Sequence, residues 1–192
     1  MIGARAALVT LWLLAIAAFS DIASPKAAPY PDGAAPGFSG GFTEQSCHAC
    51  HFEAEINTKP GQVTVAGLPE RFVAGQQYPL TITLTRAGMM AGGFQLAARV
   101  EDGGAQAGTM ELPAGEKERL AVQASNGIQY VNQRHTGTAP AEPGTAKWTV
   151  LWTAPQTRAP VVFHVAANAA DNDGSARGDY VYTATARVAP QQ

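Results

Sequence analysis

The chain has 192 residues, with 13 lysines and arginines, 15 aspartates and glutamates and a formal net charge of −2. This near-neutral balance, without a cluster of basic residues, argues against binding to nucleic acid or to an anionic membrane surface. The length suits one domain with a hydrophobic core. The two cysteines, Cys47 and Cys50, are too close together to constrain much of the unfolded chain as a disulfide.

The first 20 residues have the pattern of a secretory signal peptide. Arg5 precedes an uncharged apolar run at 6–19 that is too short to cross a bilayer comfortably, and small residues stand at Ala18 and Ser20. We expect cleavage after Ser20, with an uncleaved N-terminal anchor as the alternative. No second hydrophobic stretch follows, so the sequence predicts a periplasmic or secreted bacterial protein with no stable membrane span after cleavage.

A leader at 21–46 follows the signal peptide. It contains four prolines and four glycines and few large apolar residues. Such a composition buries too little surface to offset its ordering entropy. We therefore expect an extended leader that docks late or stays mobile.

The chain from 59 to 192 consists of short β-like runs separated by glycine and proline. Residues 78–85 alternate apolar and polar side chains, which is the period of a strand with one buried face. Similar runs occupy 62–66, 93–100, 106–112, 120–124, 147–152, 160–166 and 179–188. Seven or eight strands without a convincing amphipathic helix predict an all-β, antiparallel β-sandwich. Trp148 and Trp152 share one face of a strand and are expected in its core.

The segment 47–58 opens with the letters CHACH, which form a C-x-x-C-H motif. In such a motif two thiols form thioether bonds with the vinyl groups of one haem, and the adjacent histidine binds the iron. Cys47 and Cys50 would then tether one haem c, and His51 would be the proximal ligand. Attachment outside the bacterial cytoplasm agrees with the signal peptide.

Two other interpretations of the motif remain open. A Cys47–Cys50 disulfide would close a four-residue loop, although the βαβ unit of thioredoxin-type dithiols is absent. Zinc binding would need His48 and His51 to join both cysteines around one ion, four ligands within five residues. Structural zinc sites normally draw their ligands from two separated segments.

A haem iron bound by His51 leaves a sixth position. His135 lies in a polar loop from which an imidazole could reach the distal face, and it is the candidate distal ligand. Met89, Met90 and Met110 are alternatives, as is an open site. We interpret Met89 and Met90 as a bend between strands, and Met110 as a core residue.

The residues 171–174, with the letters DNDG, suggest calcium at first sight. Aligned to an EF-hand loop, however, their ligand positions fall on Ala169 and Tyr180, so an Asx turn between two strands is expected. The chain has no phosphate-binding glycine loop and no G-x-S-x-G motif. Nothing in the sequence predicts an enzyme.

Several stretches together resemble a known family. They are CHACHF, GLPERFVAGQQYPLTITL, GGFQLAARVEDGGAQAGTM, HTGTAP, WTVLWTAP, VVFHVAANAADNDG and GDYVYTATARV. Over about residues 37–188 the chain resembles bacterial secreted proteins of the choice-of-anchor type, in which a C-x-x-C-H segment is fused to a reeler (reelin-type) domain. The resemblance implies an immunoglobulin-like β-sandwich and covalent haem. His135 stands where the family pattern has a histidine, whereas relatives often have tyrosine at the position of His164.

The sequence thus predicts an exported, monohaem, c-type cytochrome-like protein on a reeler-like scaffold. Its function would be electron transfer, or haem-based redox chemistry or ligand binding. The expected partners are the cytochrome c maturation machinery and a redox partner of unknown identity. The alternative is a haem-free extracellular binding or adhesion module with a local Cys47–Cys50 disulfide.

Overall fold

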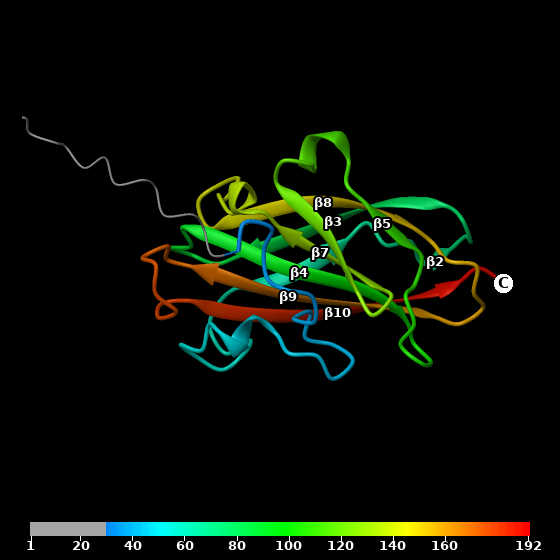
Figure 1. The fold of residues 1–192 in the computed structure, drawn as a ribbon, viewed down its shortest axis with the longest axis horizontal. Helices are drawn as coiled ribbons and strands as arrows, with labels where there is room; N and C mark the ends of the chain where they lie inside the picture. The colour runs from blue at the N-terminus through cyan, green and yellow to red at the C-terminus, as the bar shows by residue number, and fades with distance from the viewer. Residues whose placement is uncertain (1–29) are drawn as a thin grey trace, which may run out of the picture.

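The computed structural model describes residues 30–192. The predicted signal peptide at 1–20 and the leader residues 21–29 lie outside the described residues. Strands are the dominant regular elements of the described chain, joined by turns and loops (Figure 1). The strands are β1 (Gln62–Ala66), β2 (Arg71–Phe72), β3 (Gln77–Thr85), β4 (Ala91–Val100), β5 (Thr109–Glu111), β6 (Leu120–Ser125), β7 (Ile128–Gln133), β8 (Thr145–Thr153), β9 (Val161–Ala170) and β10 (Tyr180–Pro190). Three short 3-10 helices complete the described elements: η1 (Cys47–Ala49), η2 (Ala114–Glu116) and η3 (His135–Gly137).

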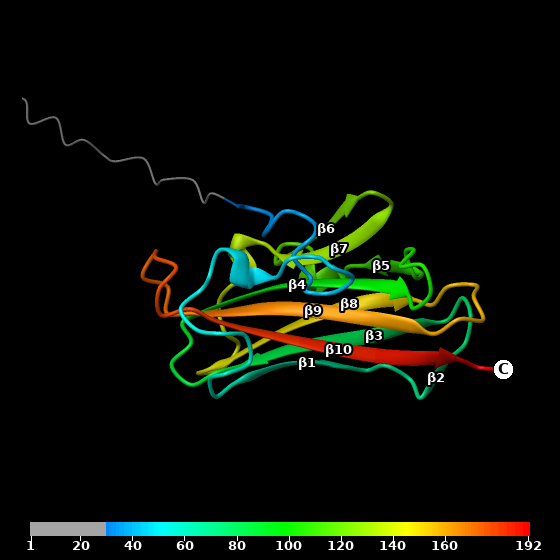
Figure 2. The same ribbon diagram turned by 90° about the horizontal axis from the view of Figure 1, so that it is seen from below.

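The strands form two sheets that pack face to face (Figure 2). One sheet has the order β1-β3-β8-β5, and the other has the order β2-β10-β9-β4-β7-β6. All named pairs are antiparallel except the short β10–β2 pair, which is parallel. The predicted all-β sandwich is confirmed.

The core lies between the two sheets and follows the alternation of the strands. In β8 every second residue is buried, including Trp148 and Trp152, which are fully inaccessible as predicted. Each indole N–H finds a carbonyl, that of Gly137 at 2.8 Å and that of Ala107 at 2.9 Å. Burial therefore leaves neither indole group without a hydrogen bond.

The structure adds strands that the sequence pattern did not predict. β7 follows β6 through Asn126 and Gly127, both of which have positive φ angles of 50° and 76°. An Asn-Gly pair in this conformation is the preferred two-residue hairpin connection. The predicted run 106–112 contains only the short β5, because the Gln106 side chain bonds the backbone of Gly108 and Gln129 instead of extending the strand.

The leader residues 30–46 lie on the outer face of the six-stranded sheet, on the β4 and β9 side (Figure 2). The buried Gln95 of β4 fixes them there. Its side chain accepts a hydrogen bond from the Phe38 N–H at 2.5 Å and donates one to the Ala35 carbonyl at 2.8 Å. The Glu44 carboxylate accepts hydrogen bonds from Arg99 and Tyr130. In this structure the leader thus covers part of the sheet.

Candidate functional site

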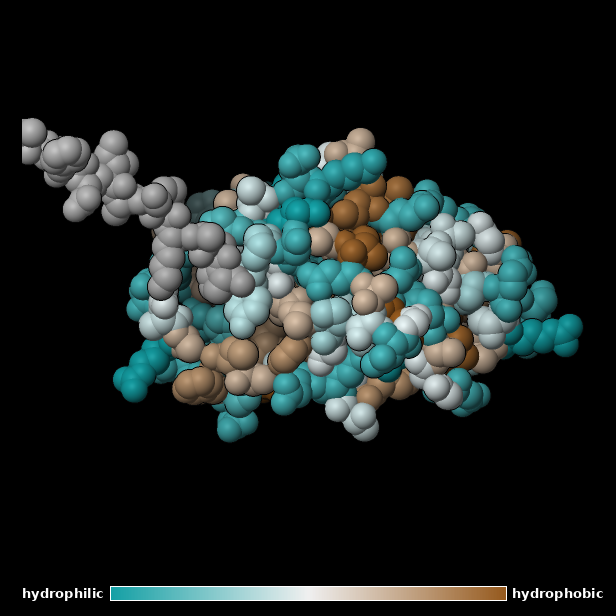
Figure 3. Space-filling view, viewed as in Figure 1, coloured by the Kyte–Doolittle hydropathy of each residue, from teal (hydrophilic) through white to brown (hydrophobic). Residues whose placement is uncertain are grey.

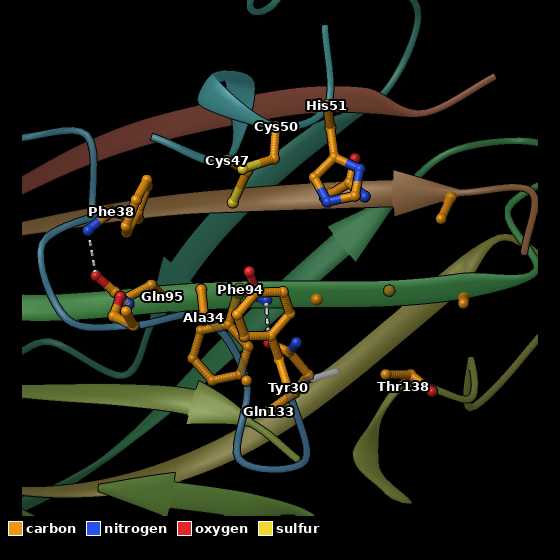
Figure 4. A pocket seen from close by; sticks show the side chains of 17 residues that line it. Tyr30, Ala34, Phe38, Cys47, Cys50, His51, Phe94, Gln95, Gln133 and Thr138 are labelled. Carbon is orange, nitrogen blue, oxygen red and sulfur yellow. Dashed lines mark hydrogen bonds between the residues drawn. The ribbon is translucent and has the colours of Figure 1, made fainter. Parts of the chain in front are cut away.

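The C-x-x-C-H segment forms one tight turn after the leader. The Ser46 hydroxyl accepts a hydrogen bond from the His48 N–H at 3.2 Å and so caps η1. The N–H groups of Cys50 and His51 both donate to the Cys47 carbonyl, at 3.2 and 3.0 Å. The turn directs Cys47, Cys50 and His51 toward the same side (Figure 4).

That side faces a cavity of about 320 Å³ between the leader, η1 and the adjoining ends of β4 and β9. Its size is at the lower end of the range for sites of small organic ligands and cofactors, about 300–1,000 Å³. The lining residues are Tyr30, Gly33, Ala34, Ala35, Phe38, Cys47, Cys50, His51, Ala91, Gly92, Gly93, Phe94, Gln95, Gln133, Thr138, Asn168 and Ala170. Figure 3 shows hydrophobic residues around a hollow in the same half of the molecule.

Small side chains keep this cavity open. Ala91, Gly93 and Ala170 lie at its sheet side, where β4 pairs with β9. A Cβ atom added to Gly93 would lie 2.9 Å from the Gln133 amide, so a larger residue would displace Gln133 or fill the cavity. Tyr30 and Gln133 lie across the cavity from Cys47 and His51 (Figure 4).

His51 is held by a buried carboxylate. Its Nδ1 lies 2.6 Å from Oδ2 of Asp179, the residue just before β10, whose side chain is 3% exposed. An ionised Asp179 carboxylate can only accept a hydrogen bond, and Nδ1 of His51 would then be the donor. The other ring nitrogen, Nε2, is then free to bind a metal. Asn168 of β9 also donates to Oδ2 of Asp179, at 3.2 Å.

The Cys47 thiol points into the cavity (Figure 4). Burial there raises the pKa of Cys47 to about 12, with a further increase from Cys50, although a backbone hydrogen bond opposes the change. Cys47 is therefore a neutral thiol at physiological pH. Reactive dithiols of the thioredoxin type depend on the opposite change, a lowered thiol pKa. Cys47 itself is partly exposed and Cys50 is more exposed, and both cysteines are free thiols in this structure.

The other candidate ligands lie elsewhere. His135 is exposed at the start of η3; its N–H donates to the Pro31 carbonyl at 3.0 Å, and its side chain does not line the cavity. His164 is covered by the leader, with the Phe42 ring edge-on at 5.1 Å. Burial, and secondarily Arg99, lower the pKa of His164.

The methionines of the described chain do not line the cavity, although Met90 precedes the lining residue Ala91 and donates its N–H to the Ala170 carbonyl at 2.9 Å. Met89 and Met110 are buried in the sandwich core, and Met90 is 63% exposed. The chain has only four histidines, all within the described residues. Among residues 30–192, His51 is thus the one histidine that lines the cavity, and no methionine joins it.

The DNDG segment is a turn, as predicted. Asp171 accepts a hydrogen bond from the Asp173 N–H at 3.1 Å, and Asp173 accepts one from the Ser175 N–H at 2.7 Å. Within residues 30–192 no group of three His, Cys, Asp or Glu side chains is arranged to hold a metal ion. Over the same range no helix is long and apolar enough to cross a membrane.

Sequence reasoning missed Asp179, Asn168 and the leader residues of the cavity. Asp179 is 128 positions from His51, and no spacing rule connects the two. Gly93 carried a weak signal, because a glycine inside a strand pattern often marks a close approach of another group.

Comparison with known proteins gives structural neighbours only. No family model matches the chain, and no curated protein matches it. The neighbours include the human F-spondin reeler domain, with 18% identity, 71% of this chain and 93% of that chain covered, and a TM-score of 0.48. A second structure of that domain has 19% identity, 69% and 93% coverage and a TM-score of 0.49. A cohesin module from Clostridium perfringens has 9% identity, 68% and 96% coverage and a TM-score of 0.45. Likeness at this level carries no argument about function, and the β-sandwich is established by the two sheets of the chain itself.

The side chains that line the cavity include the donor groups that a covalently bound haem would need. Two thiols and one imidazole converge at a single cavity, as the C-x-x-C-H chemistry requires. The imidazole has its Nε2 free, and the remaining lining is mainly apolar. A neutral thioether sulfur would suit the enclosed position of Cys47, whereas an unpaired thiolate there would be costly.

Proposed function

We propose that this chain is an exported c-type cytochrome-like protein that carries one haem on a reeler-like β-sandwich. Cys47 and Cys50 bind the haem covalently, and His51 is its iron ligand. The observation that carries the proposal is the convergence of these three side chains on one cavity, with the His51 Nδ1 engaged by Asp179. The signal-peptide pattern at 1–20 supports export to the periplasm or beyond.

The covalent step balances without an additional reactant. Each thiol adds across one vinyl double bond of the haem, so that the sulfur bonds to one vinyl carbon and the thiol proton passes to the other. No leaving group forms, and the full haem mass is added. We expect the cytochrome c maturation machinery to carry out this step, since two reduced thiols are required.

The chain's own residues would define the environment of the iron. When bound, haem supplies an iron that takes up and releases one electron. His51 would present Nε2 to it, while the leader and the small residues of β4 and β9 would exclude water from one face. Exclusion of water would shift the reduction potential of the iron, because solvent exposure is one of its determinants.

The geometry allows two uses of such a centre. Electron transfer to a partner protein is one, and binding of a small ligand at an open sixth position is the other. The composition of the lining favours ligand binding at an open sixth position. Tyr30, Gln133 and Thr138 supply polar groups there, and among the described residues that line the cavity there is no second histidine and no methionine. His135 remains the distal candidate from the sequence, and it would have to turn inward from its exposed position.

An absorption spectrum tests the proposal. The full chain is produced with the cytochrome c assembly machinery, and the matched control replaces both cysteines with alanine. We expect a haem spectrum that survives denaturation and extraction in the first protein and is lost in the control. A colourless, exported and folded wild-type protein would instead favour the haem-free binding module with a Cys47–Cys50 disulfide.

A further inference from the structure

We propose that Asp179 is the positioning residue for His51: its buried carboxylate fixes the imidazole as the Nδ1–H tautomer, directs Nε2 toward the iron and lowers the reduction potential of the bound haem. The part of this inference that concerns the iron rests on the proposed function. The part that concerns the imidazole does not. The two are therefore tested separately.

The contact between the two side chains is short and enclosed. The distance between Nδ1 of His51 and Oδ2 of Asp179 is 2.6 Å, which is within the range of a charge-assisted hydrogen bond. The Asp179 side chain is 3% exposed and that of His51 is 36% exposed. The carboxylate thus holds the inner side of the ring, while the rest of the imidazole faces the cavity.

Two further contacts fix the carboxylate itself. Asn168 Nδ2 donates to Oδ2 of Asp179 from the neighbouring strand, at 3.2 Å. Gly178 precedes Asp179 with a φ of +78°, a backbone conformation that favours glycine. A Cβ atom at Gly178 would lie 2.3 Å from the Asp171 carboxylate. The chain path into β10 therefore defines where the Asp179 carboxylate lies.

A contribution to the stability of the fold does not explain why the Asp179 carboxylate is buried beside His51. Oδ1 of Asp179 and Oδ1 of Asn168 are buried and accept no hydrogen bond from the described residues. A buried carboxylate in such surroundings is costly, and a well-packed apolar residue of similar size often serves the fold at least as well. A partner for a metal-binding histidine, in contrast, has to be a hydrogen-bond acceptor.

A carboxylate partner changes the properties of a histidine ligand in a known direction. Donation from Nδ1–H makes Nε2 more basic and fixes the orientation of the ring. A more basic ligand stabilises the oxidised iron, so the reduction potential falls. Replacement of such partners typically weakens the metal site by about 10–100-fold. Asp179→Asn should therefore raise the potential and make His51 easier to displace.

The first measurement uses haem-free protein, so its outcome is independent of haem attachment. Nitrogen-15 NMR of the imidazoles is recorded at about pH 8.5, where an ordinary histidine is neutral. We expect Nδ1–H for His51 in the wild type and a weaker preference in Asp179→Asn, because a neutral amide is a poorer acceptor and can also donate to Nδ1. The matched control is Asp173→Asn, an exposed aspartate of the same β9–β10 connection whose hydrogen bonds are to Asp171 and Ser175. An Nε2–H tautomer in wild-type protein would overturn the inference without any variant.

The second measurement is the reduction midpoint potential of haem-loaded protein. We expect it to rise in Asp179→Asn, to stay at the wild-type value in Asp173→Asn, and to return part of the way in Asp179→Glu, which keeps a carboxylate. Circular dichroism serves to check that each variant keeps the wild-type fold. A folded Asp179→Asn with the wild-type potential and the wild-type tautomer would contradict the role. If the wild type takes up no haem, the proposed function fails, while the NMR result still decides what Asp179 does to His51.

Discussion

Cys47 and Cys50 are three positions apart and lie in different surroundings. The Cys47 thiol faces the cavity and has its pKa raised to about 12, mainly by burial, whereas Cys50 is exposed. A thiol reacts through its thiolate, and a raised pKa keeps that form scarce until the pH approaches the pKa itself. The two cysteines should therefore differ in reactivity before any haem is attached.

We expect iodoacetamide at pH 8 to alkylate Cys50 in reduced, haem-free protein at least about 100-fold faster than Cys47, since the thiolate fraction falls tenfold for each pH unit below the pKa. The rate at Cys47 should rise steadily with pH toward 12. Peptide mass spectrometry follows both sites. In denaturant the rates should become similar, and equal rates in the folded protein would contradict the enclosed position of Cys47.

His135 is the residue for which sequence and structure point in different directions. The sequence favours it as a distal ligand, but it is exposed and absent from the cavity lining. We expect His135→Ala to leave the absorption spectrum and the carbon monoxide binding rate of haem-loaded protein unchanged. A change to a high-spin spectrum with faster carbon monoxide binding would show that His135 turns inward to bind the iron. Met110→Ala is the control for the methionine alternative.

The sequence predicts the local part of the site and not the rest. Cys47, Cys50 and His51 are contiguous, so their common direction follows from one turn. Asp179 approaches His51 only because β10 pairs with β9 beside η1. That proximity is a property of the sandwich and cannot be deduced from spacing.

The leader is held to the sheet by polar contacts, several of which are made by Glu44. Its carboxylate accepts hydrogen bonds from Ser39, Arg99 and Tyr130, and the Arg99 and Glu44 side chains are only 13% and 12% exposed. Removal of one partner from a buried pair leaves the other charge unpaired, which is more costly than loss of a surface pair.

Glu44→Gln should reduce the free energy of unfolding by about 3 kcal/mol. The control is Glu142→Gln, which removes an exposed carboxylate 3.8 Å from Lys147 and should change the stability by less than about 0.5 kcal/mol. Urea unfolding of haem-free protein measures both. Equal effects would mean that Glu44 does not hold the leader to the sheet.

Strands were predictable where their side chains alternate, as in β3 and β8. The outer face of β4 and β9 breaks the alternation, because the leader buries residues such as Gln95 and Ala166 that would otherwise be exposed. The composition of the leader predicted that this segment would bury little surface. Its place on the sheet depends on side chains of β4 and β7, which are distant in sequence.

The whole molecule makes the cavity by combining a β-sandwich with a segment laid over its outer face. Neither part contains the cavity alone, because the lining draws on the leader, η1, β4 and β9. The space between them depends on small residues of the sheet. Gly93 is one of them, because a Cβ atom at this position would lie 2.9 Å from the Gln133 side chain.

Gly93→Leu should fill this space and prevent most haem attachment while both cysteines and His51 remain in place. A leucine is compatible with a strand, so we expect the fold to persist in circular dichroism. The control is Gly115→Leu in η2, an exposed glycine with nothing within 4 Å of an added Cβ atom. Normal haem content in Gly93→Leu would show that haem, if bound, lies outside the cavity.

The most direct test of the account is the intact mass of the exported protein under denaturing conditions, after production with the cytochrome c assembly machinery. We predict a chain that begins near Asp21 and carries the added mass of one haem, with that mass confined to the peptide that contains Cys47 and Cys50. A mass short by two hydrogens and without haem would establish the disulfide instead and contradict the proposed function.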